Sequence, residues 1–285
     1  MLLFPNCKIN IGLRVVRKRE DGYHDIETVF YPIKGLRDEL EVERVYSQES
    51  RAQSDLSFVQ EGLAVDCAAE DNLIMKCYRQ MAERYPQIGP VRIRLRKNIP
   101  FGAGLGGGSS DAAHMAIALN ELFALGLSRE ELVQEVRSLG ADCAIFIYNE
   151  PCFATGIGDI LTPLPLSLSG RRIIMVKPDI HVSTREAYLG LALSADTAPH
   201  TPPCTIEEML RLSNDFEQTV FALHPKLAEI KQHLIDAGAV YAAMSGSGST
   251  VFGLFENDTE SSAHAGRRLL DEQTASMVIL DDTLA

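Results

Sequence analysis

The stretch "NIPFGAGLGGGSSDAA", residues 98–113, decides the fold. It gathers glycine, serine and alanine directly before an apolar helical pattern over residues 110–126. Glycine has no Cβ, so its main-chain N–H groups can approach a ligand closely, although it loses more conformational entropy on folding than other residues. The stretch therefore predicts a loop that is stabilised by something it binds or packs against, at the start of a helix.

The composition of the chain limits the classes of protein to which this loop can belong. The chain has 285 residues, of which 46% are hydrophobic, enough for one large or two ordinary domains with buried cores. Its formal net charge of -12 argues against a protein that coats nucleic acid or an anionic membrane. The six cysteines form no C-x-x-C pair and show no zinc-ligand spacing. With no signal-peptide core and no run of about 20 apolar residues, we expect a cytoplasmic protein without nucleic-acid or membrane partners.

The flanking patterns predict strands and helices. Alternation over residues 8–16 predicts a strand with Lys8 and Asn10 on one face, and residues 26–33 predict a second strand after the turn dipeptide Asp21-Gly22. A helix is expected from residue 71 to 85, capped by Asp71 or Asn72. Residues 91–99 alternate apolar and basic side chains, which predicts a strand with one solvated face. Residues 45–70 are interpreted as loops.

The remaining chain continues this mixture. Ser128 and Glu131 form a capping-box pattern for a helix that stops at Gly140, which places Asp142 just beyond it. A buried strand over 171–178, two helical stretches between residues 205 and 237, and a second glycine-serine turn over 244–255 follow. This pattern favours a two-lobed α+β chain, with domains over 1–165 and 166–285.

Of three familiar explanations of the glycine loop, the sequence excludes one and disfavours the other two. A Walker P-loop requires a lysine directly after its last glycine, and none is present. Gly102, Gly104 and Gly107 satisfy G-x-G-x-x-G, but a dinucleotide fold needs an acidic residue about 20 positions on, after a second strand, and Glu121 lies within a predicted helix. A flexible linker predicts disorder on both sides, whereas strand and helix patterns adjoin the loop directly. A phosphate cradle at a helix N-terminus remains.

The loop resembles a known family. Residues 100–113 are similar to the motif P-x-x-x-G-L-G-S-S-A-A of the GHMP kinase superfamily, which includes galactokinase, homoserine kinase and mevalonate kinase. Further similar stretches are "PNCKINIGL", "DGYHDIETVF", "EDNLI", "LGADCAIFI", "NDFE" and "MSGSGSTVF". The resemblance implies a two-lobed α+β fold: an amino-terminal ATP-binding lobe with a left-handed βαβ crossover, and a carboxy-terminal, ferredoxin-like lobe on the substrate side.

The resemblance also implies a catalytic pair, Lys8 and Asp142. In transfer of a phosphoryl group to an alcohol, Asp142 would accept the hydroxyl proton or orient the nucleophile, while Lys8 would favour the ionised carboxylate and orient the hydroxyl. The structural alternative is an ordinary strand-edge ion pair. By the same resemblance ATP would lay its phosphates over the loop, with Mg²⁺ bridging phosphate oxygens. The implied loop contacts are Pro100, Phe101, Gly102, Ala103, Gly104, Leu105, Gly106, Gly107, Gly108, Ser109 and Ser110.

Three further positions are implied near adenine and ribose: Asn72, Leu73 and Lys97. Each has an equally plain structural alternative, namely a helix cap for Asn72, a core position for Leu73 and a solvated strand end for Lys97. The pattern assigns no metal ligand and no oligomeric state.

On the substrate side, the triple glycine and the segment "GYH" resemble the branch of the superfamily whose substrate is 4-diphosphocytidyl-2-C-methyl-D-erythritol, phosphorylated at its 2-hydroxyl in the methylerythritol phosphate route to isoprenoids. The implied substrate contacts are Asn10, Tyr23, His24, Thr184, Tyr188, Gly246, Ser247 and Gly248. Tyr188 could instead be rim packing, and the second glycine turn could be a tight strand entry. A homoserine- or mevalonate-type kinase, and a non-catalytic nucleotide sensor, remain alternatives.

Overall fold

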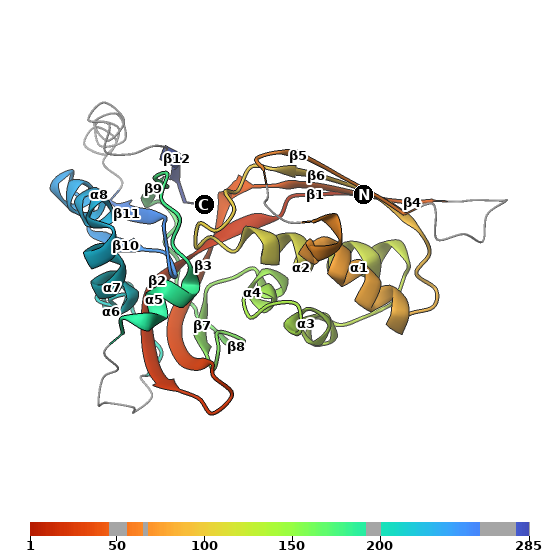
Figure 1. Ribbon diagram of the computed structural model, residues 1–285, viewed down its shortest axis with the longest axis horizontal. Helices are drawn as coiled ribbons and strands as arrows, with labels where there is room; N and C mark the ends of the chain where they lie inside the picture. The colour runs from red at the N-terminus through yellow and green to blue at the C-terminus, as the bar shows by residue number, and fades with distance from the viewer. Residues whose placement is uncertain (46–55, 65–67, 192–200, 257–277, 285) are drawn as a thin grey trace. The chain divides into compact units, whose positions relative to one another are not determined.

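The computed structural model describes residues 1–45, 56–64, 68–191, 201–256 and 278–284 (Figure 1). Its contacts divide the chain into two compact units. The first comprises Met1–Cys7, Leu36–Phe101 and Gly106–Asn149, and the second comprises Lys8–Gly35, Gly102–Leu105 and Glu150–Ala285. Both units contain helices and strands, in agreement with the predicted α+β class. The division into domains at residue 165 stays a prediction.

The first unit contains a four-stranded sheet. The strands lie in the order β1 (Leu2–Leu3), β4 (Glu39–Arg44), β6 (Val91–Lys97) and β5 (Ser57–Gly62). Strand β6 alternates as its sequence predicts, because Val91, Ile93 and Leu95 are buried and the arginines between them are exposed. Strands β5 and β6 are parallel and are connected through helix α1 (Leu73–Arg84), which makes a βαβ crossover, and the left hand that the family resemblance implies for it stays a prediction.

Helices α1 and α2 (Gly107–Leu122) lie along one side of this sheet (Figure 1). Four alanines of α2, Ala112, Ala113, Ala116 and Ala118, are fully buried, and such small side chains let neighbouring helices approach closely. The short 3-10 helix η2 (Ala69–Asp71) precedes α1, and α3 (Arg129–Arg137) and α4 (Cys143–Tyr148) complete the unit. The capping box of Ser128 and Glu131 forms at the start of α3 as predicted.

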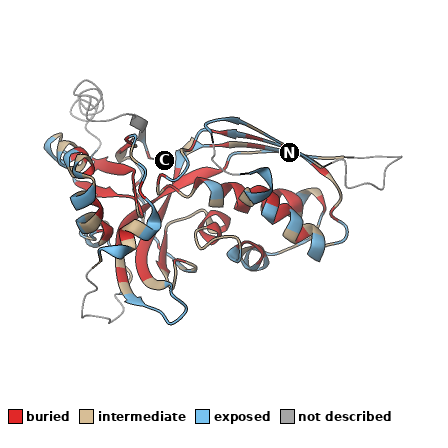
Figure 2. Ribbon diagram, viewed as in Figure 1, coloured by how far each residue is buried: buried red, intermediate tan, exposed pale blue. Residues whose placement is uncertain are grey.

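The second unit contains two sheets. The first is formed by two long strands, β2 (Asn6–Lys18) and β3 (His24–Arg37), followed by β7 (Cys152–Thr155) and β8 (Ile160–Pro163). The predicted turn between β2 and β3 is present, with Gly22 in the left-handed region at φ +87°. Most side chains of β2 and β3 are buried (Figure 2).

The second sheet of this unit has the strand order of a ferredoxin-like fold. Strands β10 (Tyr241–Met244), β11 (Val251–Phe255), β9 (Arg172–Val176) and β12 (Val278–Thr283) lie in that order, all antiparallel. Numbered along the chain this order is 2-3-1-4, as the resemblance implies. Helix α8 (Pro225–Asp236) buries Leu227, Ile230 and Leu234 in the core that this sheet shares with α7 (Phe216–Leu223).

Several expectations need correction. The sequence pattern predicts loops over residues 45–70, but residues 57–62 form β5, an edge strand that pairs with β6 alone among the described strands. Helix α4 was not predicted because six residues are too few to show a helical period. The region 205–237 holds three helices instead of two, since α6 (Ile206–Met209) is a single turn. Part of the Pro/Thr-rich connection, residues 194–200, lies outside the described residues. No helix in the described part of the chain is long and apolar enough to cross a membrane.

Candidate active site

The glycine loop leads into an open helix N-terminus. Gly106 occupies the N-cap position of α2 in the left-handed region, at φ +70°, and its carbonyl accepts the first helical hydrogen bond from the N–H of Ser110 at 2.9 Å. The first amides of an α-helix have no partner within the helix, and the helix dipole adds partial positive charge there. Gly108 is exposed and Ser109 is half-buried, so this end of α2 can receive an anion.

In the loop before the helix, residues with buried side chains alternate with glycines that have positive φ angles. Ala103 and Leu105 are buried, whereas Gly102 and Gly104 adopt positive φ angles of +63° and +76°. A Cβ on Gly104 would lie 2.1 Å from the main-chain oxygen of Ser245, so only glycine fits. The glycine at this position of the loop therefore serves close packing of the backbone.

Lys8 is anchored to this same loop. It lies on β2, is 3% exposed, and its Nζ donates to Asn10 Oδ1 at 2.5 Å and to the carbonyl of Gly104 at 3.2 Å. Its main-chain N–H donates to the Leu105 carbonyl at 3.0 Å, and its ammonium lies 5.0 Å from the centre of the Phe30 ring. These contacts fix the Lys8 ammonium beside the glycine loop, against carbonyl and amide oxygens and an aromatic face.

Asn10 shares the face of β2 with Lys8, as the strand alternation predicts. Its Oδ1 accepts from Lys8, and its Nδ2 donates to Thr28 Oγ1 at 3.1 Å. Its main-chain N–H donates to Ser245 Oγ at 3.1 Å. An asparagine amide offers two donors and two acceptor lone pairs, so one of each remains for another partner. Asn10 therefore positions Lys8, and it retains polar capacity for a substrate hydroxyl.

Asp142 lies in the other compact unit, beside the start of α2. It occupies the N-cap position of α4 and is half-buried. The turn that carries it is closed by a hydrogen bond from the Cys143 N–H to the Gly140 carbonyl at 3.1 Å. The Cys143 thiol contacts the Ser109 hydroxyl, and burial raises the pKa of this thiol to about 12. The structure thus brings Asp142 and Ser109 to one region of the first unit, while the pairing of Asp142 with Lys8 stays a prediction.

The three positions proposed near adenine and ribose differ in their surroundings. Asn72 caps α1, because its Oδ1 accepts from the N–H of Ile74 at 3.0 Å. The Leu73 side chain is half-buried and would lie 3.7 Å from a Cβ on Gly108, so it adjoins the start of α2. The alternative of a solvated strand end for Lys97 is wrong. Lys97 is 3% exposed, since its ammonium is held by the buried carboxylates of Asp38 and Asp111.

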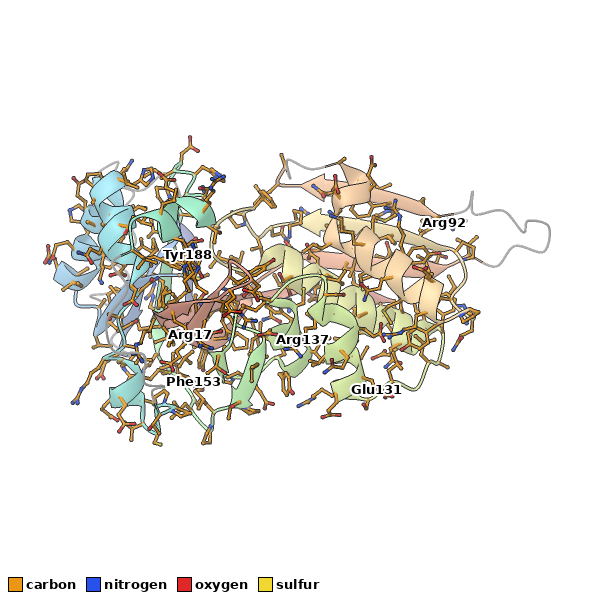
Figure 3. All side chains as sticks on the ribbon, turned by 60° about the horizontal axis from the view of Figure 1, so that its bottom comes forward. Arg17, Arg92, Glu131, Arg137, Phe153 and Tyr188 are labelled. Atoms are coloured by element: carbon orange, nitrogen blue, oxygen red, sulfur yellow. The ribbon has the colours of Figure 1, made fainter. Side chains whose placement is uncertain are left out.

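The aromatic residues of the substrate side form a stack. The His24 and Tyr188 rings lie 4.4 Å apart at 18°, and Tyr188 meets Phe216 edge-on at 4.7 Å and 81°. Tyr188 lies on helix α5 (Thr184–Leu189), where Figure 3 labels it. Burial lowers the pKa of His24, with a smaller contribution from Lys18, so the neutral imidazole is favoured. Tyr23, next to His24 in sequence, is 62% exposed at the turn.

The second glycine-serine turn is held by residues to which the sequence pattern gave no individual function. The Asn214 amide donates to the carbonyls of Met244 and Gly246, both at 2.8 Å, and Ser245 Oγ donates to the Gly104 carbonyl at 2.8 Å. The Ser247 hydroxyl lies 3.2 Å from that of Thr184. The motifs "NDFE" and "MSGSGSTVF" contained Asn214 and Ser245, but only the folded backbone reveals what they contact.

Within the described ranges, no group of three or more His, Cys, Asp or Glu side chains could hold a metal ion. Mg²⁺ in nucleotide sites is commonly bound through substrate phosphates, one or two carboxylates and water. The residues around the start of α2 are compatible with that mode, and no single side chain can be assigned as a ligand.

Comparison with known proteins identifies the family. Residues 72–150 match the model of the GHMP kinases N terminal domain, and residues 204–269 match that of the GHMP kinases C terminal domain. The 4-diphosphocytidyl-2-C-methyl-D-erythritol kinase of Bacteroides thetaiotaomicron is 48% identical over 265 residues, which cover 90% of this chain and 92% of the relative. The enzyme of the same name from Nitratidesulfovibrio vulgaris is 35% identical, with 92% of each chain covered. The chain belongs to the 4-diphosphocytidyl-2-C-methyl-D-erythritol kinase family.

Solved structures agree with this membership. A crystal structure of 4-(cytidine 5'-diphospho)-2C-methyl-D-erythritol kinase matches with a TM-score of 0.77 and 33% identity, over 95% of this chain and 96% of that one. A homoserine kinase from Cytophaga hutchinsonii matches with a TM-score of 0.69 at 16% identity, over 95% of this chain and 90% of that one, and this likeness concerns the fold alone. The two-lobed GHMP kinase fold and ATP-dependent small-molecule kinase activity follow from family membership.

Proposed function

We propose that this kinase transfers the γ-phosphoryl group of ATP to the 2-hydroxyl of 4-diphosphocytidyl-2-C-methyl-D-erythritol, giving the 2-phosphate and ADP. The observation that carries the proposal is family membership at up to 48% identity over nine-tenths of the chain, together with a buried lysine anchored to the glycine loop. The reaction belongs to the methylerythritol phosphate route to isoprenoid precursors, and we expect it to take place in the cytoplasm.

The glycine loop is the proposed binding site for the ATP phosphates. The open N-terminus of α2, with exposed Gly108 and the hydroxyl of Ser109, offers amide donors and a favourable dipole. Pro100 and Phe101, the latter 57% exposed, would border the nucleotide, with Asn72 and Leu73 on the adenine side. Mg²⁺ bound with ATP would neutralise phosphate charge.

Asp142 is the proposed proton acceptor or orienting group for the substrate hydroxyl. Lys8 would stabilise negative charge on the transferred group, and Asn10 would hold Lys8 in place while binding a substrate hydroxyl. Phosphoryl transfer to an alcohol needs little covalent help from the protein, because positioning and electrostatic stabilisation supply most of the acceleration. The acceptor carbon bears a methyl group and is therefore tertiary, so a crowded hydroxyl must be aligned accurately.

The cytosine base is proposed to bind at the aromatic stack. Tyr188 and Tyr23 would provide ring faces, and the neutral imidazole of His24 would hydrogen-bond the edge of the base. Thr184, Ser247 and the amides of Gly246 and Gly248 would bind the substrate's own phosphates. A homoserine or mevalonate substrate has no base that could use this stack.

The test is a coupled ADP-release assay with Mg-ATP and four acceptors. These are 4-diphosphocytidyl-2-C-methyl-D-erythritol, the same polyol phosphate without cytidine, homoserine and mevalonate. We expect turnover with the cytidylylated compound, and a ³¹P spectrum in which the new phosphomonoester shows no three-bond coupling to a carbinol proton, because the 2-carbon carries none. Turnover of homoserine or mevalonate instead would contradict the proposed substrate, and ATP binding without turnover of any alcohol would indicate a nucleotide sensor.

A further inference from the structure

A buried cluster of three charged side chains lies behind the start of α2. Asp38, Lys97 and Asp111 are 0%, 3% and 3% exposed, respectively. The Lys97 ammonium donates to Asp38 Oδ2 and, at 2.7 Å, to Asp111 Oδ2. We call these three residues the charge triad. One ammonium facing two ionised carboxylates leaves an excess negative charge at a buried site, which is costly unless something offsets it.

The two carboxylates are not equivalent. Asp38 Oδ1 accepts hydrogen bonds from the N–H groups of Asn98 and Ile99, at 2.6 and 2.8 Å. Asp111 Oδ1 is buried and has no hydrogen-bond partner among the described atoms. Ionised Asp38 is therefore well solvated by the protein, whereas ionised Asp111 is not, so a proton taken up by the triad resides on Asp111.

The triad lies close to the proposed phosphate site. Asp111 belongs to the first turns of α2, and a Cβ on Gly107 would lie 3.3 Å from Lys97 Nζ. The excess charge thus sits behind the same helix start whose amides face the proposed phosphates. A carboxylate here is favourable for the helix dipole, but it repels a bound phosphate.

The titration of Asp111 falls within the working range of an enzyme. Burial raises its pKa to about 7, against the opposing effect of Lys97 and with a further increase from Asp38. The buried titratable groups of α2 and of the helices packed on it, other than Asp111, are engaged elsewhere or stay neutral. They are His114 of α2, bonded to the Ser110 carbonyl with a pKa lowered by burial; Glu135 of α3, bonded to Arg84 and Tyr85; Cys77 of α1 and Cys143 of α4, with pKa values raised by burial; and Tyr78 of α1, bonded to the Gly89 carbonyl. Among the groups that are not fully buried, Glu41 of β4 is paired with Arg94, and Asp142 is half-buried at the N-cap of α4.

We propose that the charge triad of Asp38, Lys97 and Asp111 makes the affinity of this kinase for ATP depend on pH. At high pH the triad places an excess negative charge behind the phosphate loop and weakens ATP binding, and at low pH protonation removes this charge. The proposal rests on the proposed binding of ATP phosphates at the start of α2. ATP and the proton on Asp111 favour each other's binding, because linkage between two sites is reciprocal. Asp111 acts through the charge that it places behind the helix, without contact to the nucleotide.

The experiment compares wild-type protein with Asp111→Asn, which keeps the side-chain shape and removes the titrating charge. The dissociation constant of Mg-ATP is measured by calorimetry for both proteins at pH 6.0 and pH 8.5, so that titration of the ligand cancels in the ratio. We expect equal affinities within about twofold at pH 6.0 and about three- to tenfold tighter binding by the variant at pH 8.5, as one charge at this range predicts. A merely structural residue would not give tighter binding when it is replaced.

The matched control is Glu41→Gln, which removes one carboxylate from the exposed pair with Arg94 on the same sheet. It should bind Mg-ATP as the wild type does at both pH values. A ratio between wild type and Asp111→Asn that does not change with pH, or weaker binding by the variant at pH 8.5, would overturn the proposal.

A second measurement keeps the proposal testable if Asp111→Asn does not fold. Wild-type protein is titrated with Mg-ATP at pH 7.5 in buffers of different ionisation enthalpy, which gives the protons taken up on binding. At this pH Mg-ATP carries no titrating proton, so we expect net uptake by the protein, and no uptake would contradict the proposal. Failure of the wild type to bind Mg-ATP at all would instead contradict the proposed function.

Discussion

At the scale of single residues, some polar side chains of this kinase hold other residues in place, whereas others are proposed to act in the reaction. Asn10, Thr28 and Ser245 form a buried hydrogen-bonded chain next to Lys8. Asp142 is half-buried at the N-cap of α4. A residue of the first kind affects activity through stability and alignment, whereas one of the second kind affects the reaction itself.

Asp142→Ala should remove turnover while leaving ATP affinity nearly unchanged. Loss of a general base or orienting carboxylate reduces kcat by about 10²- to 10⁴-fold. The proposed phosphate cradle consists of main-chain amides of another segment, so Mg-ATP should still bind with an affinity within about threefold of wild type. Turnover is followed by ADP release and affinity by calorimetry. An equal loss of ATP binding would show that Asp142 had been given the wrong function.

Tyr188→Ala should raise the KM for the cytidylylated substrate by about tenfold, since an aromatic pair contributes about 0.5–1.5 kcal/mol beyond its buried area. The His24 and Tyr188 centroids are only 4.4 Å apart, so no third ring fits between them. The base must therefore stack on an outer face or separate the two rings. Tyr188→Phe is the matched control and should keep the wild-type KM, and an unchanged KM in Tyr188→Ala would remove Tyr188 from the proposed base site.

At the scale of elements, the glycine loop is constrained by its neighbours as much as by its ligand. Gly104 combines a positive φ with a carbonyl of Ser245 directly where a side chain would begin. Gly126, after α2, has nearly the same φ, +73°, with nothing within 4 Å of a Cβ. A comparison of substitutions at the two positions therefore distinguishes the cost of backbone strain, which both share, from the cost of steric overlap, which only Gly104 has.

Gly104→Ala should destabilise the protein by about 1–3 kcal/mol more than Gly126→Ala, because overpacking against a fixed backbone adds to the strain that both share. Urea unfolding of both variants measures the difference. The same variant should also lose activity, since Lys8 donates to the Gly104 carbonyl. Equal destabilisation by the two substitutions would mean that the loop moves freely away from Ser245.

Predictability from sequence follows the physical origin of each feature. The alternation of β6 and the capping box of Ser128 and Glu131 are local patterns, and the sequence predicts both correctly. Lys97 was not, because its burial depends on Asp38 and Asp111, which are 59 and 14 residues away in the chain. Likewise the stack of His24 on Tyr188 joins two distant segments that no period relates. The residues of the candidate site could be predicted from their resemblance to family motifs, whereas the hydrogen bonds between them could be seen only in the folded structure.

At the scale of the whole molecule, the charge triad makes stability depend on pH. The pKa of Asp111 is raised in the folded protein, to about 7, above the ordinary value of 3.8 expected on unfolding. Between these values the folded state binds more protons, so its stability falls as pH rises toward and through 7. The Asp111→Asn variant has no titrating carboxyl at this position and therefore lacks this pH-dependent contribution to stability. We expect the variant to be more stable than wild type at pH 8. Urea unfolding should also show that the variant loses less unfolding free energy than wild type between pH 5 and pH 8. If wild type instead gained more stability than the variant over this range, the assignment would be contradicted.

The measurement that tests the central claim most directly is the ratio of kcat/KM for 4-diphosphocytidyl-2-C-methyl-D-erythritol to kcat/KM for the same polyol phosphate without cytidine, with saturating Mg-ATP. Binding energy from a remote part of a substrate can be used to align the reacting group. We expect a ratio of at least about 10², with the new phosphate on the 2-hydroxyl. A ratio near one, or transfer to a different hydroxyl, would contradict the assignment of this kinase to a cytidine-bearing substrate.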